Sequence, residues 1–330
     1  MYKGLFVQRE ELRRLIYGPE EEREIGELVE LYAPPQTPEE AMGNGEMLGE
    51  CEIIFSGWGA PVLDEAFLAR APKLRAFFYG AGSVRGTVTE AVWERGITVV
   101  SAWAANAVPV AEYTLAQIFM CLKCIWQYAF AVKREKKFVP HMACAGGYRS
   151  TVGIISLGMI GRRVCELLRA HDVQVIAYDP YCGVEEARAL GVGLCSLDEV
   201  FARADVVSLH TPWLKETEGM ITGAHFAKMK QGASFINTSR GAVVREEEMI
   251  EVLKRRPDIL AVLDVTYPEP PAEGSELFSL PNVVVTPHMA GSIGPECRRM
   301  GRYIVEELQR YCAGQPLRWA ITREEAARLA

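Results

Sequence analysis

The chain has 330 residues, of which 49% are hydrophobic, and 36 basic against 43 acidic side chains give it a formal net charge of −7. This length predicts two domains with sizeable cores, and the acidic balance argues against a nucleic-acid binder or a polybasic membrane anchor. The nine cysteines have no framework spacing, there is no secretion signal, and no apolar run is long enough to span a membrane. We therefore expect a cytoplasmic protein with neither a nucleic-acid nor a membrane partner.

Three short apolar runs in the first hundred residues predict strands. They are CEIIFSG, LRAFFYGAG and ITVVSA, at residues 51–57, 74–82 and 97–102. The segment TVTEAVWERG at 87–96 has helical character and lies between the second and third runs. Alternation of strands and helices is typical of a parallel sheet covered by helices.

A long amphipathic segment follows, and it predicts one helix from Pro109 to about Lys133. It contains the pair Cys121 and Cys124 with C-x-x-C spacing. A metal or redox role would need loop geometry or a second pair, so we favour helix packing and expect no metal.

The stretch TVGIISLGMIGRRV at 151–164 predicts a strand, a tight turn and a helix that bind a dinucleotide. Gly158 would let the backbone approach the pyrophosphate, and Gly161 would let the helix pack closely on the strand. Ser156 stands where the first glycine is usual, and serine suits this turn if its φ stays negative. Asp179 ends the next strand, YDP, where a carboxylate accepts hydrogen bonds from a ribose diol.

Chemically active side chains follow four later strands. His210 ends ADVVSLH, Arg240 follows ASFINTS, Asp264 lies in LAVLDV with Glu269 five residues on, and His288 follows VVVTP. Arginine suits bidentate capture of a carboxylate, and the alternative for an isolated arginine is a surface salt bridge. Lone loop carboxylates and histidines are more often structural, and His210 either contacts a cofactor or caps its strand.

The order of these elements predicts an α/β protein with two doubly wound domains. A Rossmann cofactor domain, residues 107–292, is inserted into a smaller flavodoxin-like substrate domain made of 1–106 and 293–330. The helix at 109–133 and a second amphipathic segment at about 295–313 bridge the two. A ligand would bind in a cleft at the carboxyl ends of the strands.

Taken together, the motifs VGIISLGMIGR, YDP, SLHTP, INTSRGAVV, LDVTYPEP and TPHMAGS resemble the D-isomer-specific 2-hydroxyacid dehydrogenases in order and spacing. The resemblance spans about residues 106–292 and is looser in the outer domain, at FSGWGAP and YGAGSVRG. It implies NAD as cofactor, a 2-oxo or 2-hydroxy acid as substrate, and a homodimer formed through the bridging helices. NAD is favoured over NADP because no cation follows Asp179 in PYCG, whereas acidic residues lie just beyond.

The resemblance also implies the site residues. The catalytic residues are Arg240, Glu269 and His288. The cofactor-binding residues are Gly158, Met159, Ile160, Asp179, His210, Thr211, Thr238, Ser239, Arg240, Asp264, His288 and Gly291. The substrate-binding residues are Trp58, Ala81, Gly82, Arg240 and His288.

The implied reaction is reduction of a 2-oxo acid. Arg240 would hold the carboxylate and polarise the carbonyl, His288 would supply the proton, and Glu269 would favour the imidazolium form. Phe55 and Trp58 predict an apolar pocket wall and a nonphosphorylated substrate, although Arg85 offers a phosphate contact. The alternative is a dinucleotide-sensing binding protein, because the C-terminal-binding protein corepressors resemble this family.

Overall fold

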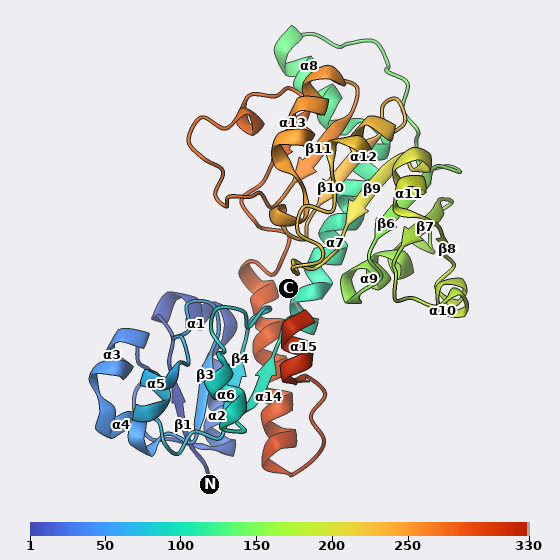
Figure 1. The fold of residues 1–330 in the computed structure, drawn as a ribbon. Coiled ribbons are helices and arrows are strands. Elements are labelled where there is room, and N and C mark those ends of the chain that lie inside the picture. Colours follow the sequence, from blue (N-terminus) through green and yellow to red (C-terminus); the bar gives the residue numbers. More distant parts are fainter. Residues whose placement is uncertain (329–330) are drawn as a thin grey trace. The chain divides into compact units, whose positions relative to one another are not determined.

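The computed structural model describes residues 1–328 and divides the chain into two compact units (Figure 1). Unit 1 is built from Met1–Ala107 and the segment that starts at Ser292, and unit 2 is Val108–Gly291. Unit 2 is therefore an insertion in unit 1. Unit 1 contains both ends of the chain, which are blue and red in Figure 1.

Unit 1 has a flavodoxin-like sheet. Among the described residues it has six strands in the order β13-β5-β4-β3-β1-β2, all parallel except β13, which pairs antiparallel with β5. The strands are β1 Lys3–Phe6, β2 Glu30–Leu31, β3 Ile53–Ser56, β4 Ala76–Tyr79, β5 Thr98–Ser101 and β13 Ala320–Ile321. The predictions for β3, β4 and β5 are confirmed, whereas β1, β2 and β13 were not anticipated.

Helices cover both faces of this sheet because its strands are apolar on both sides. In β4, Phe77 and Tyr79 point to one core, and Ala76 and Phe78 to the other. The first core packs against α3 Pro38–Gly43, α4 Gly45–Glu50, α5 Glu65–Arg70 and α6 Glu90–Glu94. The second packs against α1 Glu10–Ile16, α2 Pro19–Leu28 and α14 Cys297–Cys312. The short helices η3 Gly294–Glu296 and α15 Arg323–Arg328 complete the unit.

Unit 2 has a Rossmann sheet. In the described chain it has seven parallel strands in the order β12-β11-β10-β9-β6-β7-β8. The strands are β6 Thr151–Ile155, β7 Gln174–Tyr178, β8 Gly193–Leu194, β9 Val206–Leu209, β10 Ser234–Asn237, β11 Leu260–Leu263 and β12 Val283–Val285. The strand order reverses between β6 and β9, and open α/β sheets bind ligands at the carboxyl ends of the strands at such a point.

Two layers of helices cover this sheet. One core packs against α11 Leu197–Arg203, α12 Gly223–Lys228 and α13 Glu246–Arg255. The other packs against α7 Trp103–Leu122 and α9 Met159–Leu168. The remaining helices are α8 Ile125–Glu135, α10 Val184–Ala189, η1 Gly241–Val243 and η2 Glu276–Phe278.

The prediction of one helix from Pro109 to about Lys133 is wrong. The helix starts earlier, at Trp103, and the chain breaks into α7 and α8 at Cys124, whose φ of 53° ends the α-helical backbone. Cys121 packs in the core of unit 2, where burial raises the pKa of its thiol to about 12. Within residues 1–328 no single helix has the length and apolarity of a membrane span; α7 and α8 reach them only as a pair bent by 60°.

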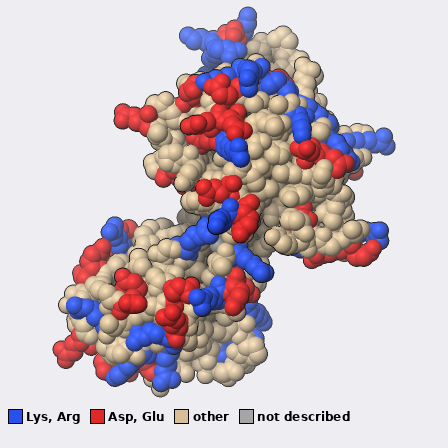
Figure 2. Space-filling model, viewed as in Figure 1, with Lys and Arg blue, Asp and Glu red and all other residues tan. Residues whose placement is uncertain are grey.

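Charges of both signs are interspersed over the face seen in Figure 2. Within the described chain, no three His, Cys, Asp or Glu side chains gather as a metal site. All nine cysteines lie within residues 1–328 and are free thiols.

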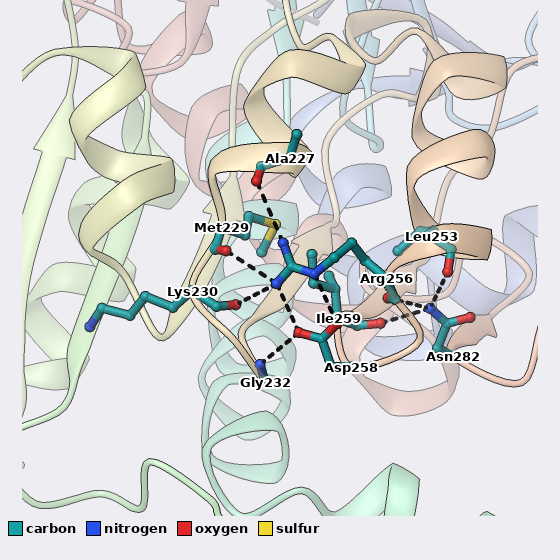
Figure 3. Close-up of polar contacts among 9 residues, drawn as sticks. All are labelled: Ala227, Met229, Lys230, Gly232, Leu253, Arg256, Asp258, Ile259 and Asn282. Carbon is teal, nitrogen blue, oxygen red and sulfur yellow. Dashed lines mark hydrogen bonds and ion pairs between the residues drawn. The ribbon is translucent and has the colours of Figure 1, made fainter.

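A polar network holds unit 2 together at the amino ends of β11 and β12 (Figure 3). Arg256 pairs with Asp258 at 2.8 Å and donates to carbonyl groups at the end of α12. Buried Asn282 donates to the carbonyl oxygens of Leu253, Arg256 and Ile259 at 3.1, 3.3 and 2.9 Å. The side chain of Asn282 thus ties α13 to the loop that enters β11.

Replacing Asn282 by Ala should destabilise unit 2. Two buried carbonyl groups and one partly buried one would lose a donor, so we expect the free energy of unfolding to fall by about 2 kcal/mol in urea titrations. Ser279→Ala is the control, because exposed Ser279 donates only to Glu276 O. Equal stability of the Asn282 variant and the wild type would show that the network contributes nothing.

Candidate active site

The glycine loop joins β6 to α9. Ser156 has φ of 76°, so the prediction of a negative φ is wrong, and the turn imposes the left-handed conformation that glycine normally supplies. A Cβ on Gly161 would lie 2.1 Å from the carbonyl oxygen of Ser156. The expected close packing of helix on strand at Gly161 is therefore confirmed.

The amino end of α9 has the properties of a phosphate cradle. Gly158 is its N-cap, with no side-chain cap, and a Cβ there would have no described protein atom within 4 Å. The first N–H groups of a helix have no partner within the helix, and its dipole attracts anions. Met159 and Ile160 form the first turn. The loop therefore fits the pyrophosphate of a dinucleotide.

Asp179 lies at the carboxyl end of β7, beside this loop. Its Oδ2 accepts from Leu157 N at 2.6 Å, and its Oδ1 accepts from Tyr181 N and Cys182 N at 2.8 and 2.9 Å. The carboxylate thus ties the glycine loop to the loop after β7. A carboxylate has about four acceptor positions, so a ribose would share it with these N–H groups.

The loop after β10 carries Arg240. Asn237 fixes the turn, since its side chain accepts from Ser239 N and donates to Arg240 O at 3.0 and 3.1 Å. The guanidinium of Arg240 donates to Ser239 O at 2.7 Å. A Cβ on Gly241 would lie 2.0 Å from the carbonyl carbon of Thr266. The loop of Arg240 is therefore in direct backbone contact with the segment that leads to Glu269.

Glu269 and His288 form a pair in unit 2. The Nδ1 of His288 lies 2.5 Å from Oε1 of Glu269, and both side chains are partly exposed. A carboxylate at Nδ1 fixes the ring and leaves Nε2 as the nitrogen that can exchange a proton. The pair thus has the arrangement of a general acid or base with an orienting partner.

The loop of His288 is held by Asp264. The buried carboxylate of Asp264 accepts from Thr286 Oγ1, Met289 N and Ala290 N at 2.6, 2.9 and 2.8 Å. Its carbonyl oxygen also accepts from His288 N at 2.9 Å. The carboxylate of Asp264 therefore positions the loop of His288. The predicted contact of Asp264 with the cofactor stays a prediction.

Tyr113 and Thr114 are residues that the sequence analysis missed. The hydroxyl of Tyr113 lies 3.1 Å from Thr286 Oγ1, and that of Thr114 lies 3.1 Å from Thr238 Oγ1. Both come from α7 and contact residues that directly follow β12 and β10. The sequence pattern of this segment predicts a helix but does not show which of its side chains form hydrogen bonds.

Four further predicted residues line up at the ends of β9 and β10, and all are buried: His210, Thr211, Thr238 and Ser239. Ser239 Oγ donates to Thr211 O, which joins the two loops. His210 Nε2 lies 3.0 Å from Ser208 Oγ, and burial lowers the pKa of His210 to about 4. His210 is therefore neutral at physiological pH. Gly291 is the last residue of unit 2 and directly follows the His288 loop.

The predicted substrate residues Trp58, Ala81 and Gly82 lie in unit 1. Ser101 Oγ donates to the carbonyl groups of Ala81 and Gly82 at 2.9 and 2.6 Å, which fixes that loop. The interpretation of Phe55 as a pocket wall is wrong, because its ring is fully buried between Phe6 and Phe78 in the core. Trp58 is partly buried beside the same core.

The burial of neutral His210 predicts a pH-dependent stability. The unfolded chain takes up a proton near pH 6.5 and the folded chain only near pH 4, so stability is present above pH 6.5 and is lost as pH falls. From about pH 7 to pH 5 the wild type should lose about 2 kcal/mol more than His210→Asn in urea unfolding. Parallel pH profiles of the two proteins would contradict this.

The chain is similar to proteins of one known family. Residues 115–290 match the family model described as "D-isomer specific 2-hydroxyacid dehydrogenase, NAD binding domain", so NAD is the cofactor of unit 2. The "D-3-phosphoglycerate dehydrogenase" of Archaeoglobus fulgidus is 33% identical over 262 residues, which are 78% of this chain and 49% of the relative. That of Methanocaldococcus jannaschii is 31% identical over 293 residues, 88% and 55% of the two chains.

The chain thus spans about half the length of the curated relatives it matches. Among solved structures, D-lactate dehydrogenase with NAD⁺ from Lactobacillus jensenii is similar with a TM-score of 0.79 and 25% identity. The similarity covers 98% of this chain and 100% of that one.

Proposed function

The chain belongs to the D-isomer-specific 2-hydroxyacid dehydrogenase family, and from this premise we propose that it transfers a hydride between NAD(H) and a small 2-oxo acid or D-2-hydroxy acid. The observation that carries the proposal is the contact of His288 Nδ1 with Glu269 Oε1 at 2.5 Å. It is supported by the packing of the Arg240 loop against Thr266, three residues before Glu269.

The proposed chemistry assigns one task to each side chain. When bound in unit 2, NADH would supply the hydride that reduces the carbonyl carbon of the 2-oxo acid. Arg240 binds the substrate carboxylate through two N–H groups and polarises the carbonyl oxygen. His288 Nε2 donates a proton to the alkoxide oxygen, and Glu269 stabilises the imidazolium before that transfer. In the oxidation direction, neutral His288 takes the hydroxyl proton.

The proposed substrate is defined by its reacting group, a carboxylate beside a carbonyl or a hydroxyl group. A carboxylate beside a carbonyl or hydroxyl is what one guanidinium and one imidazole recognise. The relatives named for phosphoglycerate favour a phosphorylated acid, and Arg85 is the candidate phosphate contact in this chain. The absence of a cation from FSGWGAP still predicts a nonphosphorylated acid, although buried Phe55 no longer supports that prediction.

NADH oxidation with a panel of 2-oxo acids tests the proposal. The panel contains glyoxylate, pyruvate, hydroxypyruvate, a bulkier 2-oxo acid and 3-phosphohydroxypyruvate. Turnover of any member supports the proposal, and the preferred member decides the question of phosphate. Tight NADH binding without turnover would contradict it and favour a dinucleotide-sensing binding protein.

Arg240 should be essential for turnover. Arg240→Lys loses the two-pronged contact, so we expect kcat/KM to fall by about 10²-fold, and Arg240→Ala should nearly abolish activity. NADH should still bind to both variants, as measured by fluorescence, because the other predicted cofactor residues are unchanged. Arg245→Lys is the control, because Arg245 is exposed and pairs with Glu248. Full activity in Arg240→Ala would sink the assignment.

We further propose a homodimer formed through α8 and the segment that follows it. Large apolar side chains are exposed there: Ile125, Phe130, Phe138, Met142 and Tyr148, with Phe138 exposed to 95%. Such a concentration of exposed apolar groups is typical of a protein interface.

Light scattering coupled to size-exclusion chromatography tests this. The wild type should elute as a dimer, and Phe130→Glu with Phe138→Glu should elute as a folded monomer, because two charges would be buried without partners. Val62→Glu is the control, since Val62 is also exposed but lies in unit 1. A monomeric wild type would overturn the proposal.

A further inference from the structure

A charged cluster lies beside Asp179. Arg162 comes from α9, Glu186 from α10, and Cys182 from the loop between β7 and α10. The Nη1 of Arg162 pairs with Oε1 of Glu186 at 2.7 Å, and its Nη2 contacts Cys182 Sγ at 4.0 Å. Cys182 N in turn donates to Asp179 Oδ1. Cys182 therefore links the guanidinium of Arg162 to Asp179, the carboxylate predicted to hold the adenosine ribose.

The negative charge of Glu186 disfavours binding of a phosphate group beside it. The hydrogen bond from Arg162 lowers the pKa of Glu186, so this carboxylate is charged at neutral pH. The guanidinium of Arg162 is thus already paired with one carboxylate, that of Glu186. The 2′-phosphate that distinguishes NADP from NAD carries up to two negative charges and needs a cation that no carboxylate already holds.

Arg162 has the reach to be that cation. Its side chain is 32% exposed, and it already extends toward the loop after Asp179. Because guanidinium groups bind phosphate through two parallel hydrogen bonds, a displaced Glu186 would leave a ready phosphate ligand.

We propose that Glu186 determines the preference for NAD over NADP by holding the guanidinium of Arg162, which would otherwise bind a 2′-phosphate. The proposal deepens the proposed function and rests on the adenosine ribose lying at Asp179. It does not depend on which 2-oxo acid is reduced. A purely structural role is the alternative, since the pair also ties α9 to α10.

Binding of NADH and NADPH to the purified chain, without any 2-oxo acid, tests the proposal. Glu186→Gln keeps the shape of the side chain and removes its charge. We expect NADPH affinity to rise by about tenfold while NADH affinity stays nearly constant. Adenosine 2′,5′-bisphosphate against 5′-AMP should show the same gain, which isolates the 2′-phosphate from the nicotinamide half.

Two further variants make the test specific. Glu185→Gln removes the same charge from the same helix, but Glu185 pairs with Arg188 at 2.8 Å, so its NADPH-to-NADH affinity ratio should stay close to that of the wild type. Adding Arg162→Ala to Glu186→Gln should abolish the gain. An equal gain in Glu185→Gln, or a gain that persists without Arg162, would overturn the proposal. A chain that binds NADH but reduces no 2-oxo acid would contradict the proposed function only.

Discussion

The buried carboxylate of Asp264 accepts hydrogen bonds from Thr286, Met289 and Ala290, and the arrangement of the candidate site depends on it. A buried charge is tolerated when its oxygens are satisfied in this way. The three bonds fix the loop after β12 against the end of β11, and this loop carries His288. Together with the bond from His288 N to Asp264 O, they position His288, whose φ is 52°, for its contact with Glu269.

Much of the fold was predictable because it depends on patterns of local sequence. Val- and Ile-rich runs that end in Gly, Pro, Ser or Asp predicted β3 to β7 and β9 to β12 and their alternation with helices. The pattern missed β1, which has four residues, and β2, β8 and β13, which have only two residues each, too few for a periodicity. It also missed the break at Cys124, because the apolar spacing continues across it and only the backbone conformation changes.

The site was predictable as a set of residues but not as a network. Strand ends predicted that Arg240, Glu269 and His288 occupy one edge of the sheet. They did not predict that Asn237 shapes the Arg240 turn, or that Gly241 lets it contact Thr266, because these depend on tertiary distances. Phe55 was predicted to form a pocket wall, but its ring is buried in the core, because an aromatic residue beside a loop can face either way. Ser156 shows that a turn can impose a positive φ on a residue that disfavours it.

The most direct test of the central claim follows the hydride itself. NADH that carries deuterium at both C4 positions is incubated with the wild-type protein and its preferred 2-oxo acid, and the product is analysed by mass spectrometry and chiral chromatography. The account predicts one deuterium at C2 of a 2-hydroxy acid of D configuration. A product without deuterium, or one of L configuration, would contradict it.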